Sequence, residues 1–265
     1  MKLNKQSNLY TVIYIIVLVM VVGTALAFTS MSLKDRQQAN ADAAKMKQIL
    51  AAARITVSEG ENISEVFNKC IIEQPVFDTK GNRIAHAKAF DVDVQKQVQM
   101  PDAERHLPLY IAQLADGSIK LIVPMYGNGL WGPIWGYVAF DNTENATVYG
   151  AFFDHQGETP GLGAEIAKSQ FSDQFRGKSP YGSNGKFMGI AVIKKGMKAP
   201  EGEAFVDGIS GGTITSKGVD AMINNCLNPY KTILRELSAE TSGQNPIGSD
   251  NRAVNGTSDE GRKNG

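Results

Sequence analysis

The segment 207–216, which reads DGISGGTITS, contains the residue types best suited to chemistry in this sequence. Its three glycines permit positive φ angles and close backbone approach, and its four hydroxyl side chains can form hydrogen bonds. A helical pattern follows at once, and a helix N-terminus offers free N–H groups and a favourable dipole to an anion. The residues alone leave two interpretations open: a phosphate-binding loop, or a tight turn whose Ser216 caps the next helix.

Several common kinds of site are disfavoured by the rest of the sequence. The glycine segment has neither the Gly-Lys-Ser/Thr of a Walker loop nor a GxGxxG turn. Cys70 and Cys226 are too far apart in sequence for a CxxC zinc or redox pair, although a disulfide between them stays open. His86, His106 and His155 share no metal-ligand spacing. The 27 basic and 27 acidic residues leave no charge excess for nucleic acid, so we expect neither a metal site nor a nucleic-acid partner.

Strand patterns occupy the middle of the chain. Segments 110–114 and 119–123 flank an Asp-Gly pair that suits a hairpin turn, and segments 135–140 and 146–153 flank a second polar turn. Apolar residues alternate with acidic ones over 90–94, which predicts a further strand with one solvated face. Successive hairpins predict a largely antiparallel, twisted sheet.

Helical patterns lie on either side of these strands. Segment 34–54 is rich in alanine, lysine and glutamine, with apolar residues at steps of three or four, and segment 216–237 has a similar pattern. The fold class is therefore α+β, with helices flanking the sheet of a folded domain over 34–237. Segment 238–265 is polar and small, which predicts a disordered tail.

A long apolar run precedes the domain. Residues 9–33 form 25 positions without a charge, and a helix of that length reaches about 37 Å against a hydrocarbon core of about 30 Å. The run is longer than the apolar part of most signal peptides, so a transmembrane helix after a short tail, 1–8, is favoured over a cleaved signal sequence. Basic residues lie on both sides of the run, so charge alone leaves the side of the domain open.

The order Asp-Gly-x-Ser-Gly-x-Thr in 207–213 resembles the flavinylation motif of the covalent FMN-binding domains in sodium-translocating NADH:quinone reductases and Rnf complexes. In that family the last threonine of the motif carries FMN through a phosphoester, which implies attachment at Thr213. Gly212 stands where the family usually has alanine, a change of one small residue for another. The resemblance places Asp207, Ser210, Gly211, Gly212 and Thr215 around the cofactor.

Two further segments are similar to the same family. Segment 126–137 resembles its glycine-tryptophan stretch, and the Leu-Trp-Gly form at Leu130 and Trp131 is more like the C subunit of the sodium-pumping reductase than the G subunit of the Rnf complex. Tryptophans at these positions also suit a core role beside a sheet. The segment Glu-Thr-Pro-Gly-Leu-Gly resembles the loop that lies against the flavin. The residues that it adds to the cofactor site are Glu158, Thr159, Gly161, Leu162 and Gly163.

The resemblance, which covers residues 1 to about 237, implies a membrane-anchored flavoprotein subunit that relays electrons and has no turnover alone. It implies attachment of FMN by a separate flavin transferase, partner subunits that deliver and accept electrons, and a domain on the periplasmic side of a bacterial inner membrane. An Rnf-type subunit is one alternative. A membrane-anchored binding or sensor domain without a redox role is another, and there the segment 207–216 would be only a turn.

Overall fold

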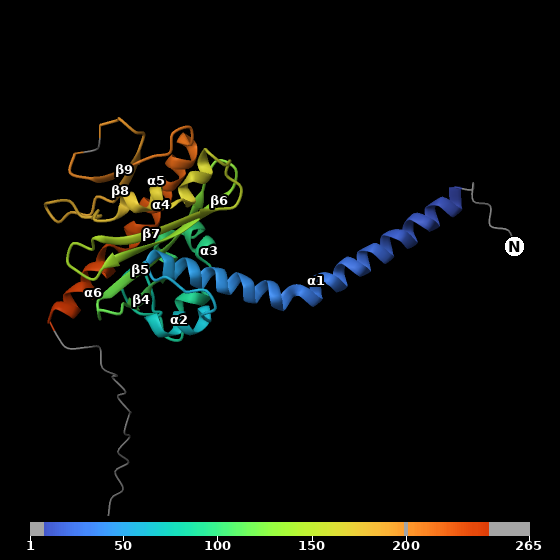
Figure 1. The fold of residues 1–265 in the computed structure, drawn as a ribbon, viewed down its shortest axis with the longest axis horizontal. Helices are drawn as coiled ribbons and strands as arrows, with labels where there is room; N and C mark the ends of the chain where they lie inside the picture. Colours follow the sequence, from blue (N-terminus) through green and yellow to red (C-terminus); the bar gives the residue numbers. More distant parts are fainter. Residues whose placement is uncertain (1–7, 199–200, 244–265) are drawn as a thin grey trace, which may run out of the picture.

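A five-stranded antiparallel sheet forms the centre of the domain in this computed structural model, which describes residues 8–198 and 201–243 (Figure 1). The strands lie in the order β1-β4-β5-β6-β7. Their bounds are β1 Ile71–Glu73, β4 Tyr110–Gln113, β5 Ile119–Asn128, β6 Pro133–Asp141 and β7 Val148–His155. The expected α+β fold with a largely antiparallel sheet is confirmed.

Both hairpins predicted from the sequence are present. Gln113 pairs with Ile119 across the first turn, and Phe140 pairs with Val148 across the second. A third hairpin joins β5 to β6, in which Asn128 pairs with Pro133 and the backbone N–H of Gly129 donates to the carbonyl of Gly132 at 2.8 Å. This tight β5–β6 turn projects beyond the sheet at one end.

Helices cover both faces of the sheet. Ile122 on β5 packs in one core cluster with Ile49 and Leu50 of α1 (Asn8–Ala52). Its neighbours in sequence, Leu121 and Val123, point to the other face because successive strand residues alternate, and there they pack with α5 (Thr213–Leu227). The sheet is thus the middle of three layers.

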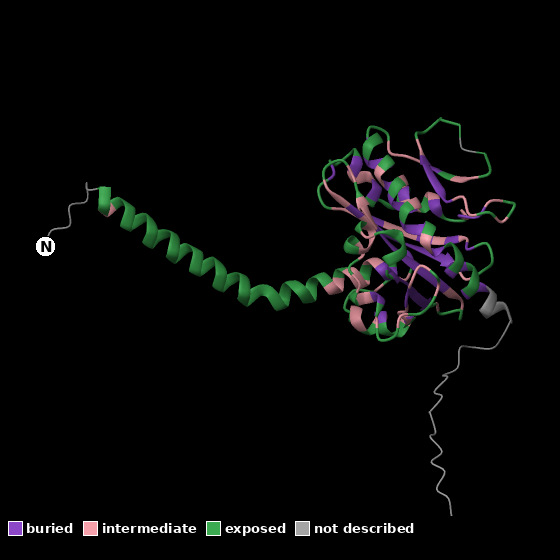
Figure 2. Cartoon of the chain, turned by 180° about the vertical axis from the view of Figure 1, so that it is seen from behind, coloured by how far each residue is buried: buried purple, intermediate pink, exposed green. Residues whose placement is uncertain are grey.

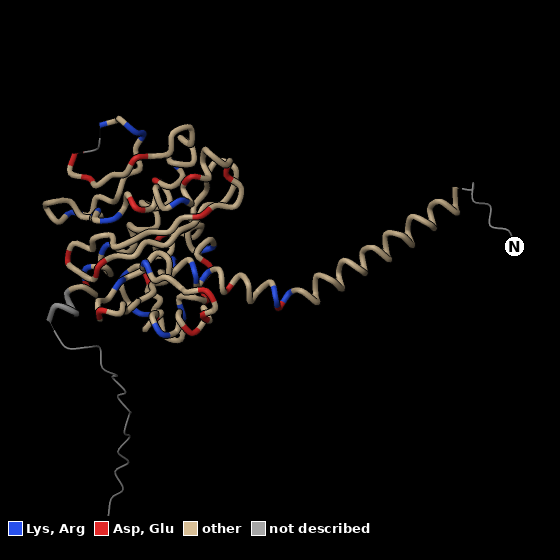
Figure 3. The backbone as a smooth tube through the Cα atoms, in the orientation of Figure 1, with Lys and Arg blue, Asp and Glu red and all other residues tan. Residues whose placement is uncertain are grey.

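The helix α1 runs from Asn8 into the domain without a break. Only its last residues are buried, and its apolar part is exposed except at the half-buried Tyr10 (Figure 2). It is the one helix in the described part of the chain that is long and apolar enough to cross a membrane. Figure 3 shows the apolar part free of charged side chains until the charges that begin at Lys34. The predicted helix over 34–54 and the predicted apolar helix before it are therefore one continuous element.

The remaining elements are shorter than α1 and α5. The α-helices among them are α2 Ile63–Cys70, α3 Val94–Gln99, α4 Ser169–Ser172 and α6 Lys231–Gly243; the strands are β2 Val76–Phe77, β3 Leu107–Pro108, β8 Ile190–Ile193 and β9 Ala204–Asp207; the 3-10 helices are η1 Ala89–Asp91, η2 Asp102–Glu104, η3 Gly163–Ala167, η4 Asp173–Phe175 and η5 Asn228–Tyr230. The β8–β9 pair is parallel, which the sequence patterns did not indicate.

The strand predicted over 90–94 is wrong. The 3-10 helix η1 covers the start of this segment, and α3 begins at Val94. The carboxylate of Asp93 accepts a hydrogen bond from the backbone N–H of Lys96 at 3.3 Å, so Asp93 caps α3. A capping aspartate favours a helix start, and this local bond overrides the apolar alternation.

The C-terminal helix predicted over 216–237 differs from the structure at both ends. It begins at Thr213, and the turn η5 interrupts it at Pro229, which has no N–H to continue the α-helical bonding. The second part, α6, continues to Gly243, so the tail predicted from residue 238 is helical in its first residues. The remainder of that tail, 244–265, lies outside the described residues. Both cysteines are free thiols, so the disulfide left open by the sequence is absent.

Candidate functional site

The glycine segment connects the end of β9 to the start of α5. The side-chain amide of Gln174 forms hydrogen bonds with both backbone polar groups of Asp207. It accepts from the N–H at 3.0 Å and donates to the carbonyl at 3.3 Å. The N–H of Gly208 donates to the carbonyl of Ile193 at 2.6 Å, and Gly211 has a φ of +76° that favours glycine. The chain thereby turns sharply from the strand into the helix.

The four hydroxyl side chains of this segment have different surroundings. Ser216 is buried, and its hydroxyl oxygen accepts from the backbone N–H of Ile209 at 2.8 Å. It does not cap α5, because Gly212 is the residue that precedes the helix. Thr215 is 1% exposed and donates to Glu158 at 2.5 Å. Ser210 and Thr213 are exposed, and only Thr213 combines exposure with a place in the first turn of the helix.

The N-terminus of α5 is open to an anion. The preceding Gly212 has no side chain that could satisfy the first N–H groups, and no side-chain cap is present at this helix start. The first N–H groups of a helix have no partner within the helix, and the helix dipole places partial positive charge there. A phosphate ester on the exposed Thr213 would lie beside these N–H groups, which are suited to donate hydrogen bonds to its oxygens.

Exposed apolar side chains surround this helix start. They belong to three different segments, namely Leu130 (47% exposed), Trp131 (69%), Leu162 (43%) and Ile214 (56%), and together we call them the apolar rim. Leu162 lies against the glycine segment, since its Cδ2 would be 2.6 Å from a Cβ placed on Gly211. Exposed large side chains gathered in one place mark a binding surface more often than isolated ones do.

The two tryptophans have opposite roles. Trp135 is partly buried against the α1 side of the sheet, and its indole N–H donates to Gln48 at 3.1 Å, so the expected core role is correct for this residue. For Trp131 the core role is wrong, because the indole extends from the β5–β6 turn into solvent. Among the described residues, no neighbouring element covers this side chain.

Glu158 lies beneath the rim and is only 4% exposed. Its carboxylate accepts from the backbone N–H of Trp131 at 2.8 Å and from the hydroxyl of Thr215 at 2.5 Å. Gly129 and Gly163 lie against its two oxygens, where a Cβ on either glycine would collide. The structure therefore brings the glycine-tryptophan turn, the Glu158 loop and the start of α5 together around one buried carboxylate.

The loop after Glu158 forms a compact turn. The carbonyl of Thr159 accepts from the N–H groups of Leu162 and Ala164, each at 3.1 Å, and Gly161 has a φ of +76°. Thr159 and Gly161 are exposed, whereas Gly163 is buried under the start of α5. An open hollow of about 510 Å³ adjoins this turn, with Ser210, Ile209, Gly161, Glu165, Lys168, Gln170, Phe171 and Gln174 around it.

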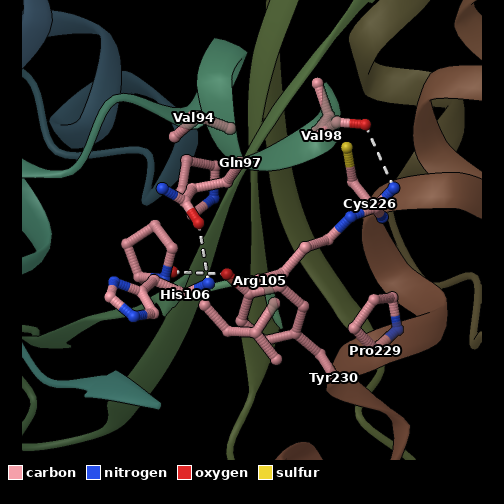
Figure 4. Close-up of a pocket in the computed structure, with 11 residues that line it drawn as sticks. Val94, Gln97, Val98, Arg105, His106, Cys226, Pro229 and Tyr230 are labelled. Atoms are coloured by element: carbon pink, nitrogen blue, oxygen red, sulfur yellow. Dashed lines mark hydrogen bonds between the residues drawn. The ribbon is translucent and has the colours of Figure 1, made fainter. Parts of the chain in front are cut away.

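A second cavity lies among α3, β5 and α5 (Figure 4). Arg105 lines it, donating to the carbonyls of Met100 and Val98 and to the side chain of Asn225. The cavity volume is about 20 Å³, enough for about one water molecule. This site therefore serves packing, with Arg105 joining α3 to α5. Among the described residues, no group of three or more metal-ligating side chains occurs.

Sequence reasoning missed two contributors to the site around Thr213. Ile214 is one, and its signal is a large apolar residue in the first turn of a helix whose neighbours are polar. Gln174 is the other, and it carries no sequence signal because its role depends on η4 lying beside β9.

Comparisons with known proteins match the region of this site and most of the chain. A family described as FMN-binding domain matches residues 129–228, which include the β5–β6 turn, the Glu158 loop and α5. The C subunit of the Na(+)-translocating NADH-quinone reductase of Haemophilus ducreyi is 33% identical over 234 residues, covering 83% of this chain and 89% of the relative. The corresponding subunit of Vibrio anguillarum is 33% identical over 233 residues, with coverage of 82% and 89%.

Two solved structures have the same fold. The crystal structure of the C subunit of a Na(+)-translocating NADH-quinone reductase from Parabacteroides distasonis matches with a TM-score of 0.69 and 44% identity, covering 76% of this chain and 96% of that one. The crystal structure of Shewanella oneidensis NqrC matches with a TM-score of 0.63 and 25% identity, covering 76% and 99%.

Proposed function

This chain belongs to the family of C subunits of Na(+)-translocating NADH-quinone reductases, and on that premise we propose that it carries FMN bound to Thr213 through a phosphoester. It is a flavoprotein subunit of such a reductase, and an Rnf-type subunit is not favoured. FMN supplies one- and two-electron redox chemistry when it is bound. The protein has to hold the cofactor and expose it to partners, which is why no catalytic side-chain constellation is needed.

The observation that carries the proposal is the exposure of Thr213 at the first residue of α5. Its hydroxyl is open to an attaching enzyme, and the free amides of the first helical turn stabilise a phosphate there. Thr215 and Ser216 are buried and hydrogen-bonded within the protein. Ser210 is exposed but lies before the helix, where the amides of the first turn are farther along the chain.

The surrounding residues divide into two groups. Asp207, Ser210, Gly211, Gly212 and Thr215 form the segment that holds the phosphate end. The apolar rim would hold the ring end, for which the exposed Leu130, Trp131 and Leu162 offer apolar contacts. Thr159 and Gly161 border this surface, and Glu158 and Gly163 support it from beneath. Apolar and aromatic contacts suit a flat flavin ring, and the exposed position leaves it accessible to other subunits.

Attachment requires a separate flavin transferase that uses FAD and magnesium. In that reaction the Thr213 hydroxyl would accept the FMN phosphoryl group of FAD, with AMP as the leaving group and the hydroxyl proton passing to solvent. Other subunits deliver and accept the electrons, so the isolated chain has no turnover. Residues 9–33 anchor the chain in a bacterial inner membrane, and the FMN-binding domain, 34–237 together with the end of α6, lies on the periplasmic side.

The experiment is production of the full chain together with the flavin transferase, followed by denaturing electrophoresis viewed under ultraviolet light. The wild-type band fluoresces, Thr213→Ala abolishes the fluorescence, and the control Lys217→Ala, at an exposed position outside the segment 207–216, keeps it. Mass spectrometry of the peptide containing residues 207–217 then locates the FMN phosphate. A dark wild-type band, or a fluorescent Thr213→Ala band, contradicts the proposal.

The periplasmic placement has its own test. In a Cys70→Ser background, which removes the accessible native thiol, a cysteine introduced at an exposed position of the domain, such as Lys195→Cys, is labelled in intact spheroplasts by a membrane-impermeant maleimide. The control is a cysteine placed before the apolar run, which is labelled only after lysis. The reverse pattern places the domain on the cytoplasmic side.

A further inference from the structure

We propose that Glu158 is a positioning residue that holds the two walls of the flavin site together, and that it acts through Trp131 and Thr215 without touching the cofactor. One wall is the β5–β6 turn, which carries Trp131, and the other is the start of α5, which carries Thr213. The inference rests on the proposed function, because the site that these walls form is the flavin site.

The carboxylate of Glu158 bridges the two walls directly. One oxygen, Oε1, accepts from the backbone N–H of Trp131 at 2.8 Å, and the other, Oε2, accepts from the hydroxyl of Thr215 at 2.5 Å. Trp131 belongs to the turn and Thr215 to the first turn of the helix. Both oxygens are thus occupied by the two segments that they connect, which leaves neither directed at a ligand.

Two glycines make room for this carboxylate. A Cβ on Gly129 would be 2.5 Å from Oε1, and a Cβ on Gly163 would collide with both Oε2 and the hydroxyl of Thr215. These contacts are far closer than carbon and oxygen atoms permit, so the glycines are needed to let the three segments approach. The pocket around Glu158 is therefore fitted to a carboxylate in this one place.

The backbone of Glu158 is also fixed. Its N–H donates to Nδ1 of His155 at 3.2 Å, and His155 is the last residue of β7, paired with Ile134 of β6. The sheet thereby holds the main chain of Glu158 while its side chain holds the two walls. The position of the walls is set relative to the sheet as well as to each other.

Glu158 carries out this role without a cationic partner. In the described part of the chain no lysine or arginine forms an ion pair with Glu158. Its carboxylate accepts hydrogen bonds from neutral donors instead, at the N-terminal end of α5, where the helix dipole is positive. A buried donor that loses its acceptor costs more free energy than the hydrogen bond itself contributes, because the donor cannot form a hydrogen bond to water instead. Removing the carboxylate therefore frees both walls at once.

The test uses the full chain in detergent micelles, produced without the flavin transferase so that the site holds no flavin. Hydrogen–deuterium exchange of the Trp131 amide is compared among wild type, Glu158→Ala and Glu158→Gln. We expect exchange about tenfold faster or more in Glu158→Ala, because the amide loses a buried acceptor. Glu158→Gln exchanges close to the wild-type rate, since its oxygen accepts from Trp131 while its amide donates to the Thr215 hydroxyl.

Glu165→Ala is the matched control. Glu165 is a carboxylate of the same region whose Oε1 accepts from the N–H of Gly161 at 3.1 Å and whose Oε2 pairs with Lys168. Its removal speeds exchange at Gly161 and leaves the Trp131 amide unchanged. The amide of Ile122 in the sheet reports whether a variant is folded, and it exchanges at the wild-type rate in all three variants.

A second measurement connects the positions of the walls to the cofactor. When the same variants are produced with the transferase, flavin per protein falls about tenfold in Glu158→Ala and stays near the wild-type level in Glu158→Gln and Glu165→Ala. Wild-type exchange at Trp131 in Glu158→Ala overturns the inference. So does a Glu158→Gln variant with normal exchange at Trp131 and the same flavin loss as Glu158→Ala, because the charge would then act on the cofactor. Correct exchange rates with no flavin on the wild-type chain support the positioning role and contradict the proposed function.

Discussion

At the scale of single residues, exposure separates side chains that are chemically alike. Thr213 and Thr215 are two positions apart in one helix, yet only Thr213 reaches solvent. Trp131 and Trp135 belong to one hairpin, yet only Trp135 contributes to the core. The residues available for chemistry at this site are those for which the fold provides no internal partner.

Trp131→Ala is expected to change the fluorescence of the bound flavin without changing the fold. The indole is largely exposed, so the free energy of unfolding stays within about 0.5 kcal/mol of the wild type, whereas the fluorescence of bound flavin rises because an aromatic neighbour is lost. Trp135→Ala is the comparison, because it removes packing and the bond to Gln48 and lowers the melting temperature. Thermal unfolding and flavin fluorescence of the purified chain check both, and unchanged flavin fluorescence in Trp131→Ala argues against the rim as the ring surface.

The two cysteines are expected to react differently with iodoacetamide. Burial raises the pKa of the Cys226 thiol to about 11, so at pH 8 about one molecule in a thousand carries the reactive thiolate. Cys70 is only partly buried at the end of α2 and reacts first. Mass spectrometry of the folded chain finds one alkylated cysteine, at Cys70, and labelling of Cys226 rises only as the pH approaches 11. Rapid labelling of both at pH 8 contradicts the packing of α5 on β5.

At the scale of elements, the placement of α5 depends on close contact with β5. Gly127 of β5 lies against Met222, where an added Cβ would be 2.7 Å from the Met222 Cβ. Gly218 of α5 lies against the carbonyl of Asn128 with no room for a side chain. The helix start that carries Thr213 is held beside the β5–β6 turn by these glycine contacts.

Gly218→Ala is expected to destabilise the protein although alanine is the better helix former. Helix propensity alone would raise the free energy of unfolding by up to about 1 kcal/mol for this change. The new methyl group meets the backbone of Asn128, and overpacking against a fixed neighbour costs about 1–3 kcal/mol, so the net change is a loss. Thermal unfolding of the full chain in detergent measures it, with Lys217→Ala on the exposed face of the same helix as the control. A raised melting temperature would show that α5 is free to move away from β5.

At the scale of the whole molecule, α1 is both the apolar helix and a part of the core. Ile49 and Leu50 are fully buried under the sheet, and the helix is continuous from there back to Asn8. Figures 1 and 2 show α1 entering the domain as one uninterrupted helix with a bend along its length. Within the described part of the chain, one continuous helix therefore joins the apolar segment to the domain that carries Thr213.

Inserting residues into the exposed part of α1 after Arg36 is expected to disturb electron transfer without disturbing flavin attachment. Two alanines turn the domain by about 200°, whereas seven restore the rotation to within about 20° and add about 10 Å. Quinone reduction by the assembled complex falls more with two alanines than with seven, and flavin per protein is the same in both. Equal activity of the wild type and the two-alanine chain would show that partners do not depend on this orientation.

The sequence by itself determined the features that depend on neighbouring residues. A long apolar run predicts the first part of α1, and an Asp-Gly pair between apolar segments predicts the β4–β5 hairpin, because both patterns act over a few residues. The resemblance of the glycine segment pointed to Thr213. Where two local signals competed, as in 90–94, the apolar alternation gave the wrong element and the cap at Asp93 prevailed.

Only the tertiary structure decided which of these side chains are covered. Thr215 is buried against Glu158, which is 57 positions away from it in sequence, whereas Thr213 in the same helical turn is exposed. The exposure of Trp131 depends on a tight turn that no other described element covers, and the place of Glu158 depends on two glycines from different segments. Such contacts join residues far apart in the chain, and a pattern of neighbouring residues holds no information about which distant segment packs against them.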